Sequence, residues 1–223
     1  MAPSFVANEN VDVFFAIALV FLVISLLLKP SYITTSLFFW LVFNLYIVYL
    51  PFVSGADYIF FMLALWCVPM VTRPMFKSET GSTIQKACYN SGVILCKLQI
   101  VFIYLVSGWD KLNSEVWRSG QAFDYITHLG NMFNPMFSGV FDNPLLQLIL
   151  SWITILFELA FVVLIWFRKT KIPMLIMGVL FHLFIWIVLS LPDFAAVMIV
   201  SYIIFLTDTE ITGLRNLLKR SLP

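Results

Sequence analysis

Long apolar runs recur from one end of this sequence to the other, and they constrain the fold more than any other feature. Each run is bounded by charged residues or by proline and glycine, and most approach the roughly 20 residues that a helix needs to cross a bilayer. The runs are Val13–Leu28, Ile33–Leu50, Tyr58–Val71, Cys88–Trp109, Leu145–Phe167, Ile172–Leu191 and Phe194–Leu206. We therefore predict an all-α, polytopic transmembrane helix bundle of about seven spans, forming one domain over residues 1–223.

The composition excludes a soluble globule, because 61% of the residues are hydrophobic and only 11% are charged. The first residues, MAPSFVANENVDVFF, contain acids and no positive region, so we expect a retained first span instead of a cleaved signal peptide. A net charge of +1 gives no sign of a nucleic-acid partner. Membrane lipids are the partners that this composition predicts.

The basic residues predict the orientation of the bundle. Of the 13 Lys and Arg, only Lys111 and Arg118 fall on one side of the predicted membrane, and Lys97 lies inside a span. The others share the opposite side: Lys29, Arg73, Lys77, Lys86, Arg168, Lys169, Lys171, Arg215, Lys219 and Arg220. By the positive-inside rule the N-terminus is outside and the C-terminus is cytoplasmic. The membrane is either a bacterial inner membrane or that of the endoplasmic reticulum.

The segment from Asp110 to Asn143 is too polar to span the membrane and too apolar to lie free in water. Its apolar residues recur at helix-like spacing: Trp117, Phe123, Ile126, Leu129, Met132 and Phe133. This pattern is typical of an amphipathic helix in the membrane interface, where it would cover a cavity from the outer side.

Ionisable residues inside spans are costly, so each one requires a partner or a function. Lys97, Glu158 and His182 each lie about ten residues from the cytoplasmic end of a span, which places all three roughly 15 Å from the inner surface. We predict a buried Lys97–Glu158 pair with His182 nearby. The alternative is that Lys97 reaches the interface, Glu158 is protonated or bonded to a hydroxyl, and His182 only packs.

Lys97, Tyr104 and Lys111 are spaced by seven residues and so share one face of the fourth span. A polar stripe of this kind is typical of a helix that lines an internal cavity. Two interpretations of Lys111 are open: an interfacial anchor, or a general base at the outer rim of the cavity.

A resemblance to a known family begins in the stretch KLQIVFIYLVSGWDKLNSEVWRSG. The residues that carry it are Lys97, Gln99, Tyr104, Gly108, Lys111, Leu112, Trp117 and Gly120, followed in order by Glu158, Phe181 and His182. In these residues the chain resembles the HTTM group of membrane proteins, whose best-understood member is the vitamin K-dependent gamma-carboxylase. The resemblance covers an HTTM-like core of about residues 87–208.

The resemblance implies a catalytic role for Lys111, as the base that deprotonates a quinol such as vitamin K hydroquinone and starts an O2-dependent epoxidation. In the carboxylase this reaction removes a glutamate γ-proton, and CO2 then adds, which is lyase chemistry. The implied pocket residues are Lys97, Gln99, Tyr104, Trp117, Glu158 and His182. The carboxylase also has a large extra-membrane region that 223 residues do not accommodate, so we do not expect glutamate carboxylation from this chain alone.

Two functions are compatible with these residues. One is a quinol-dependent oxygenase or carboxylase-like enzyme; the other is a non-catalytic membrane subunit for maturation, export or anchoring of a partner protein or peptide. A transporter is disfavoured by the lack of an inverted repeat. The three cysteines show no metal-ligand spacing, so no metal site is expected.

Overall fold

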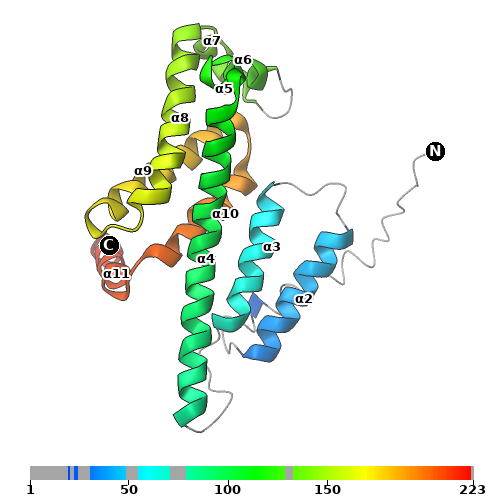
Figure 1. The fold of residues 1–223 in the computed structure, drawn as a ribbon, viewed down its shortest axis with the longest axis vertical. Coiled ribbons are helices and arrows are strands. Elements are labelled where there is room, and N and C mark those ends of the chain that lie inside the picture. The colour runs from blue at the N-terminus through cyan, green and yellow to red at the C-terminus, as the bar shows by residue number, and fades with distance from the viewer. Residues whose placement is uncertain are drawn as a thin grey trace, which may run out of the picture. The chain divides into compact units, whose positions relative to one another are not determined.

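The computed structural model describes residues 20, 23–24, 31–48, 55–70, 79–128 and 133–221. All regular secondary structure in these residues is helical, with ten α-helices, three short 3-10 helices and no strand (Figure 1). The chain forms two compact units, residues 1–96 and 97–223. The all-α prediction is therefore confirmed for the described residues.

In the first unit, helix α2 (Tyr32–Val48) packs against α3 (Gly55–Cys67), which continues into the 3-10 helix η2 (Val68–Met70). Ser31 precedes α2 and its hydroxyl accepts a hydrogen bond from the Thr34 backbone N–H at 3.2 Å, so the helix begins with a side-chain cap. Phenylalanine rings fill the contact between the helices. The centres of the Phe39 and Phe61 rings are 5.4 Å apart.

The second unit contains the C-terminal part of α4, which runs over Glu79–Asn113, and the remaining helices. The longer ones are α8 (Pro144–Leu164), α9 (Arg168–Leu189), α10 (Pro192–Ser201) with the 3-10 helix η5 (Tyr202–Phe205), and α11 (Asp208–Ser221). Asn143 and Pro144 set the start of α8, because the Asn143 carboxamide oxygen accepts from the Leu145 N–H at 3.0 Å and proline needs no partner at the first position.

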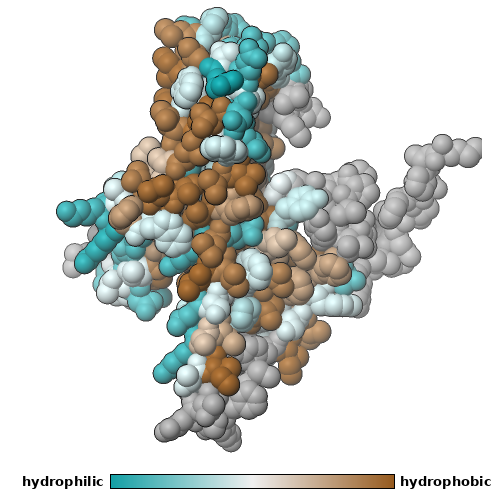
Figure 2. All heavy atoms as spheres, viewed as in Figure 1, coloured by the Kyte–Doolittle hydropathy of each residue, from teal (hydrophilic) through white to brown (hydrophobic). Residues whose placement is uncertain are grey.

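Three described helices are long and apolar enough to cross a membrane: Thr83–Asn113, Pro144–Leu164 and Arg168–Leu189. They coincide with the fourth, fifth and sixth predicted runs. The second, third and seventh runs fall on the shorter apolar helices Ile33–Asn44, Gly55–Met70 and Pro192–Phe205, and nearly all of the first lies outside the described residues. Figure 2 shows apolar side chains along the visible face of α8, as a lipid-facing helix requires. The count of seven spans and their orientation stay predictions.

The segment after α4 is divided into short helices instead of the one amphipathic helix that we predicted. These are α5 (Glu115–Arg118), α6 (Gln121–Thr127), the 3-10 helix η4 (Pro135–Phe137) and α7 (Ser138–Phe141), which we call the cap. The breaks have local causes: Gly120 has a φ of 87° between α5 and α6, and Asn134 caps the turn at Pro135. Leu129 and Met132 lie outside the described residues.

The cap is held by its own aromatic core and by α8 and α9. Phe123, Phe133 and Phe141 are buried together with Val188 of α9, so their apolar side chains pack inward. Gln147 of α8 donates a hydrogen bond to the Phe141 carbonyl at 2.6 Å. These contacts fix the cap over the ends of α8 and α9.

Helix α11 is joined to the start of α9 by a single acidic side chain. Glu210 accepts from Lys171 Nζ at 2.7 Å and from the Thr207 backbone N–H at 2.8 Å, a capping-box arrangement. The Lys171 ammonium and the Thr207 N–H both favour the carboxylate, and they lower the pKa of Glu210 to about 2.

Gly120→Ala is expected to destabilise the cap, because an alanine there would hold an unfavourable φ and its Cβ would lie 2.8 Å from the Leu148 backbone. The conformational part alone costs about 1–2 kcal/mol. Thermal unfolding in detergent should show a lower Tm for this variant. Gly139→Ala is the matched control, since nothing lies within 4 Å of the added Cβ in α7. Equal Tm values for the two variants would contradict this account of the cap.

The contribution of Glu210 to stability is expected to be complete above its unfolded-state pKa of 4.5 and to disappear as the pH falls toward its folded-state pKa of about 2. The Tm difference between wild type and Glu210→Gln should therefore be constant near neutral pH and shrink over this acidic window. Lys171→Met should reduce this pH dependence, because the Thr207 N–H still favours the carboxylate, whereas the exposed Lys169→Met should keep it in full. A Tm difference that persists unchanged at low pH would refute this assignment.

Candidate functional site

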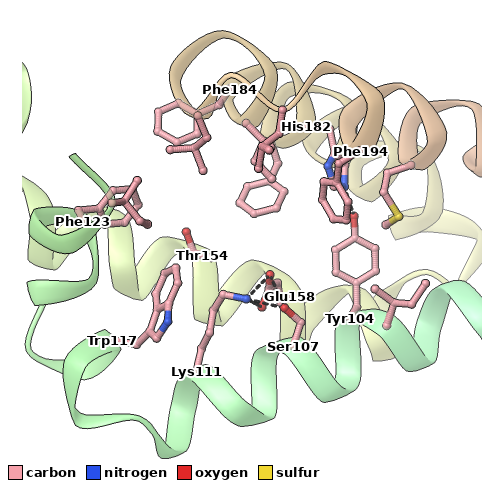
Figure 3. Close-up of a pocket in the computed structure, with 17 residues that line it drawn as sticks. Tyr104, Ser107, Lys111, Trp117, Phe123, Thr154, Glu158, His182, Phe184 and Phe194 are labelled. Carbon is pink, nitrogen blue, oxygen red and sulfur yellow. Dashed lines mark hydrogen bonds and ion pairs between the residues drawn. The ribbon is translucent and has the colours of Figure 1, made fainter. Parts of the chain in front are cut away.

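A cavity of about 210 Å³ lies in the second unit, between the end of α4, the cap and helices α8, α9 and α10. Most of its walls are apolar or aromatic, with contributions from Phe123, Phe181, Phe184 and Phe194. The polar side chains gather in two groups. In Figure 3, Lys111, Ser107 and Glu158 meet on one wall, while Tyr104 and His182 lie together at one end.

Lys111 and Glu158 form an ion pair that joins α4 to α8. Lys111 Nζ donates to both carboxylate oxygens of Glu158 at 3.0 Å, and it also donates to the Ser107 hydroxyl. The side chains are 18% and 6% exposed, respectively. The pair is therefore largely removed from water, where such interactions are strong and an unpaired partner is costly.

Two local features of α4 bring this pair together. Gly108 is buried against α8: a Cβ added there would lie 3.0 Å from Leu159 and 3.1 Å from Glu158. The missing side chain thus lets the helices approach closely enough for Lys111 to reach the carboxylate. On the other side, the Trp117 ring centre lies 5.0 Å from Lys111 Nζ, a cation–π contact supplied by the cap.

A second polar network lies at one end of the cavity. The Tyr104 hydroxyl is hydrogen-bonded to His182 Nε2 at 2.8 Å and also to the hydroxyl of Tyr202. Tyr104 is 2% exposed and stacks on Phe161, with ring centres 4.2 Å apart. His182 is 1% exposed, and its Nδ1 has no hydrogen-bond partner among the described residues. This nitrogen is a buried hydrogen-bonding position that the described residues leave unfilled.

Five of the seven site residues predicted from the sequence line this cavity: Tyr104, Lys111, Trp117, Glu158 and His182. Gln99 and Lys97 belong to the same helix but are not among the lining residues. The shared face that we predicted for α4 thus holds for Tyr104 and Lys111. Lys97 lies two turns farther along the helix, outside the cavity.

The predicted Lys97–Glu158 pair is wrong. Glu158 pairs with Lys111, and Lys97 Nζ instead lies 5.9 Å from the centre of the Phe205 ring. Equal depth in the membrane does not fix the direction in which a side chain points around its helix axis. Lys111, two residues from the end of α4, points back along the helix toward Ser107 and so reaches Glu158.

Three polar residues in or next to the site were not predicted: Ser107, Thr154 and Tyr202. Ser107 precedes Lys111 by four residues and Thr154 precedes Glu158 by four, so each lies one turn away on the same helix face. Helical spacing could have identified both. Tyr202 reaches Tyr104 from η5 through tertiary packing, and no spacing in the sequence links the two residues.

Comparison with known families extends the resemblance found in the sequence. The chain matches the HTTM domain over residues 6–209, well beyond the core of about 87–208 that carries the recognisable residues. This domain is also found in the vitamin K-dependent gamma-carboxylase. No curated protein and no solved structure gives a match to the sequence. Because the match covers most of the chain, this protein belongs to the HTTM domain family.

Proposed function

We propose that this protein is a membrane-embedded enzyme that binds a hydroquinone, such as a reduced naphthoquinone, and uses Lys111 as the base that activates it toward O2. The observation that carries this proposal is Lys111 itself. Its amine is fixed by Glu158 and Ser107 inside a cavity whose other walls are mostly apolar or aromatic. A lysine that only anchors α4 at the membrane interface would not need these partners.

The size and lining of the cavity suit an aromatic ring. An apolar protein cavity of about 150 Å³ is large enough to bind benzene, so 210 Å³ holds a ring with its substituents. Aromatic side chains on several walls can stack on such a ring or meet its edge. A large hydrophilic substrate would leave its polar groups unpaired against these walls.

Two polar groups in the cavity match the two oxygens of a hydroquinone. Lys111 and Glu158 would receive one oxygen, and the network of Tyr104 and His182 would receive the other. Figure 3 shows Lys111 and Glu158 on one wall and Tyr104 farther toward one end, and all three residues line the same cavity.

Lys111 can act as a base without a net change of charge in the site. Transfer of one proton from Lys111 to Glu158 converts the ion pair into an amine and a carboxylic acid, both neutral. The Lys111 amine then takes the proton of the ligand hydroxyl, which leaves an ammonium beside a ligand oxyanion. Glu158 and Ser107 hold the amine in place for this step, and the oxyanion is the electron-rich form that reacts with O2.

The competing function is that of a non-catalytic subunit for a partner protein or peptide. In that case the ion pair would serve only to fix α4 against α8. The two functions differ in what they require of Lys111, because a structural pair can be replaced by apolar packing whereas a base cannot.

Lys111→Met is expected to lower O2 uptake with a reduced naphthoquinone by at least roughly 100-fold, the usual effect of removing a general base. Uptake would be measured with an oxygen electrode on protein purified in lipid nanodiscs. Lys97→Met is the matched control, because it removes a lysine from the same helix outside the cavity, and it should retain uptake. Equal uptake by wild type and Lys111→Met would refute the catalytic role.

The Lys111–Glu158 pair allows a test that separates stability from catalysis. Lys111→Met and Glu158→Leu should each destabilise the protein by roughly 3–5 kcal/mol, because each leaves a buried partner uncompensated. The double variant should recover most of the Tm, since two apolar side chains can pack where the charges were. It should not recover O2 uptake. Recovery of uptake together with Tm would assign the pair a structural role only.

A further inference from the structure

Three sulfur atoms gather in the first unit, on residues that do not line the cavity of the second unit. Cys67 ends α3, Met70 ends η2, and Cys96 lies on α4. The Cys96 thiol donates a hydrogen bond to Met70 Sδ at 4.0 Å, and the thiols of Cys67 and Cys96 are hydrogen-bonded to each other. We call these three residues the sulfur cluster.

The local structure explains why the three sulfurs meet. Cys67 and Met70 are three residues apart, in the stretch CVPM, so they lie on the same side of the 3-10 turn that follows α3. Gly92 precedes Cys96 by four residues and shares its face of α4. A Cβ added at Gly92 would lie 2.5 Å from Met70 Cγ and 2.8 Å from the Trp66 carbonyl oxygen. The missing side chain thus lets η2 approach the face of α4 that carries Cys96.

The spacing of the sulfurs fits a shared metal ion. Two sulfurs that each lie about 2.3 Å from one ion, at the angle of about 120° of trigonal coordination, are about 4.0 Å apart. The observed distance from Cys96 Sγ to Met70 Sδ is 4.0 Å. Cys96 is buried and Cys67 is exposed, so the cluster has both an anchored ligand and a side from which an ion can enter. The flexible Met70 side chain can adjust to the ion.

The chemistry of these ligands selects the metal. A thioether and thiolates are soft ligands that favour Cu(I), whereas protein zinc sites use cysteine, histidine and carboxylates. Among the described residues, no group of three or more His, Cys, Asp or Glu side chains is placed to hold a metal ion, so no such side chain completes the cluster as a zinc site. The spacing of the cysteines alone predicted no metal site, because a methionine supplies the third ligand.

We propose that Cys67, Met70 and Cys96 form a three-coordinate binding site for Cu(I). Metal binding requires deprotonated cysteine, so loss of one thiol proton balances the single charge of the ion. The charge of this part of the first unit then stays unchanged on binding, as an apolar surrounding requires. The inference goes beyond the proposed function and does not depend on it.

Cu(I) binding can be measured on the full chain, purified in detergent under reducing and oxygen-free conditions, by competition with the coloured Cu(I) chelator bicinchoninate. Wild type is expected to hold one Cu(I) per chain, with three sulfur neighbours in X-ray absorption spectra. Met70→Leu should leave two sulfur neighbours and weaken binding at least about tenfold, because loss of a group that merely supports a metal ligand already costs that much. Cys96→Ser should abolish binding.

Cys88→Ser is the matched control, because it removes a thiol from α4 eight residues before Cys96 and outside the cluster, and it should bind Cu(I) like wild type. Met70→Leu nearly conserves the side-chain volume, so its metal-free Tm should equal that of wild type and a loss of affinity reports the missing sulfur. Absence of binding by fully reduced wild type, or equal affinity in wild type, Met70→Leu and Cys96→Ser, would overturn the inference. Lys111→Met should bind Cu(I) like wild type, whatever its effect on O2 uptake.

Discussion

The ion pair between Lys111 and Glu158 is the interaction on which the rest of the second unit depends. Two charges withdrawn from water are tolerated only when each has a partner and the remaining hydrogen-bonding positions are filled. Here α4 supplies the cation, α8 supplies the anion, and Ser107 bonds to both, at 3.2 Å in the case of Glu158. Loss of either partner leaves an uncompensated charge. The contact therefore sets the register of α4 against α8, and it places a paired ammonium and carboxylate on the wall of the cavity.

The surrounding structure meets the requirements of this pair. Gly108 removes the side chain that would separate the helices, and Trp117 places an aromatic face near the ammonium. Trp117 belongs to the cap, whose path depends on the positive φ of Gly120 and whose aromatic core rests on α9. The cap thus covers the side of the site that α4 and α8 leave open, and it keeps the pair in an environment of low dielectric constant.

Helix formation, the apolar runs and five of the residues that line the cavity could be predicted from the sequence, because each depends on local periodicity or on the rarity of a feature. A lysine or glutamate in an apolar run is conspicuous, and a spacing of seven places Tyr104 and Lys111 on one face. The partner of Glu158 could not be predicted. The sequence gives the depth of a residue along its helix, but it does not give the rotation of one helix about its axis relative to its neighbour. The contact between Tyr202 and Tyr104 likewise depends on tertiary packing.

Two of the lysines of α4, Lys97 and Lys111, show what makes a charge in an apolar helix part of a site. Lys97 and Lys111 share a predicted helix face, yet only Lys111 meets a carboxylate, while Lys97 lies near the Phe205 ring. A lysine at the face of a ring can keep its charge without an anion, since its long apolar stem packs against its neighbours. Lys111 instead lies in a wall where charge, hydroxyl and aromatic groups converge on open space. That combination matches a ligand with an aromatic ring and a polar edge.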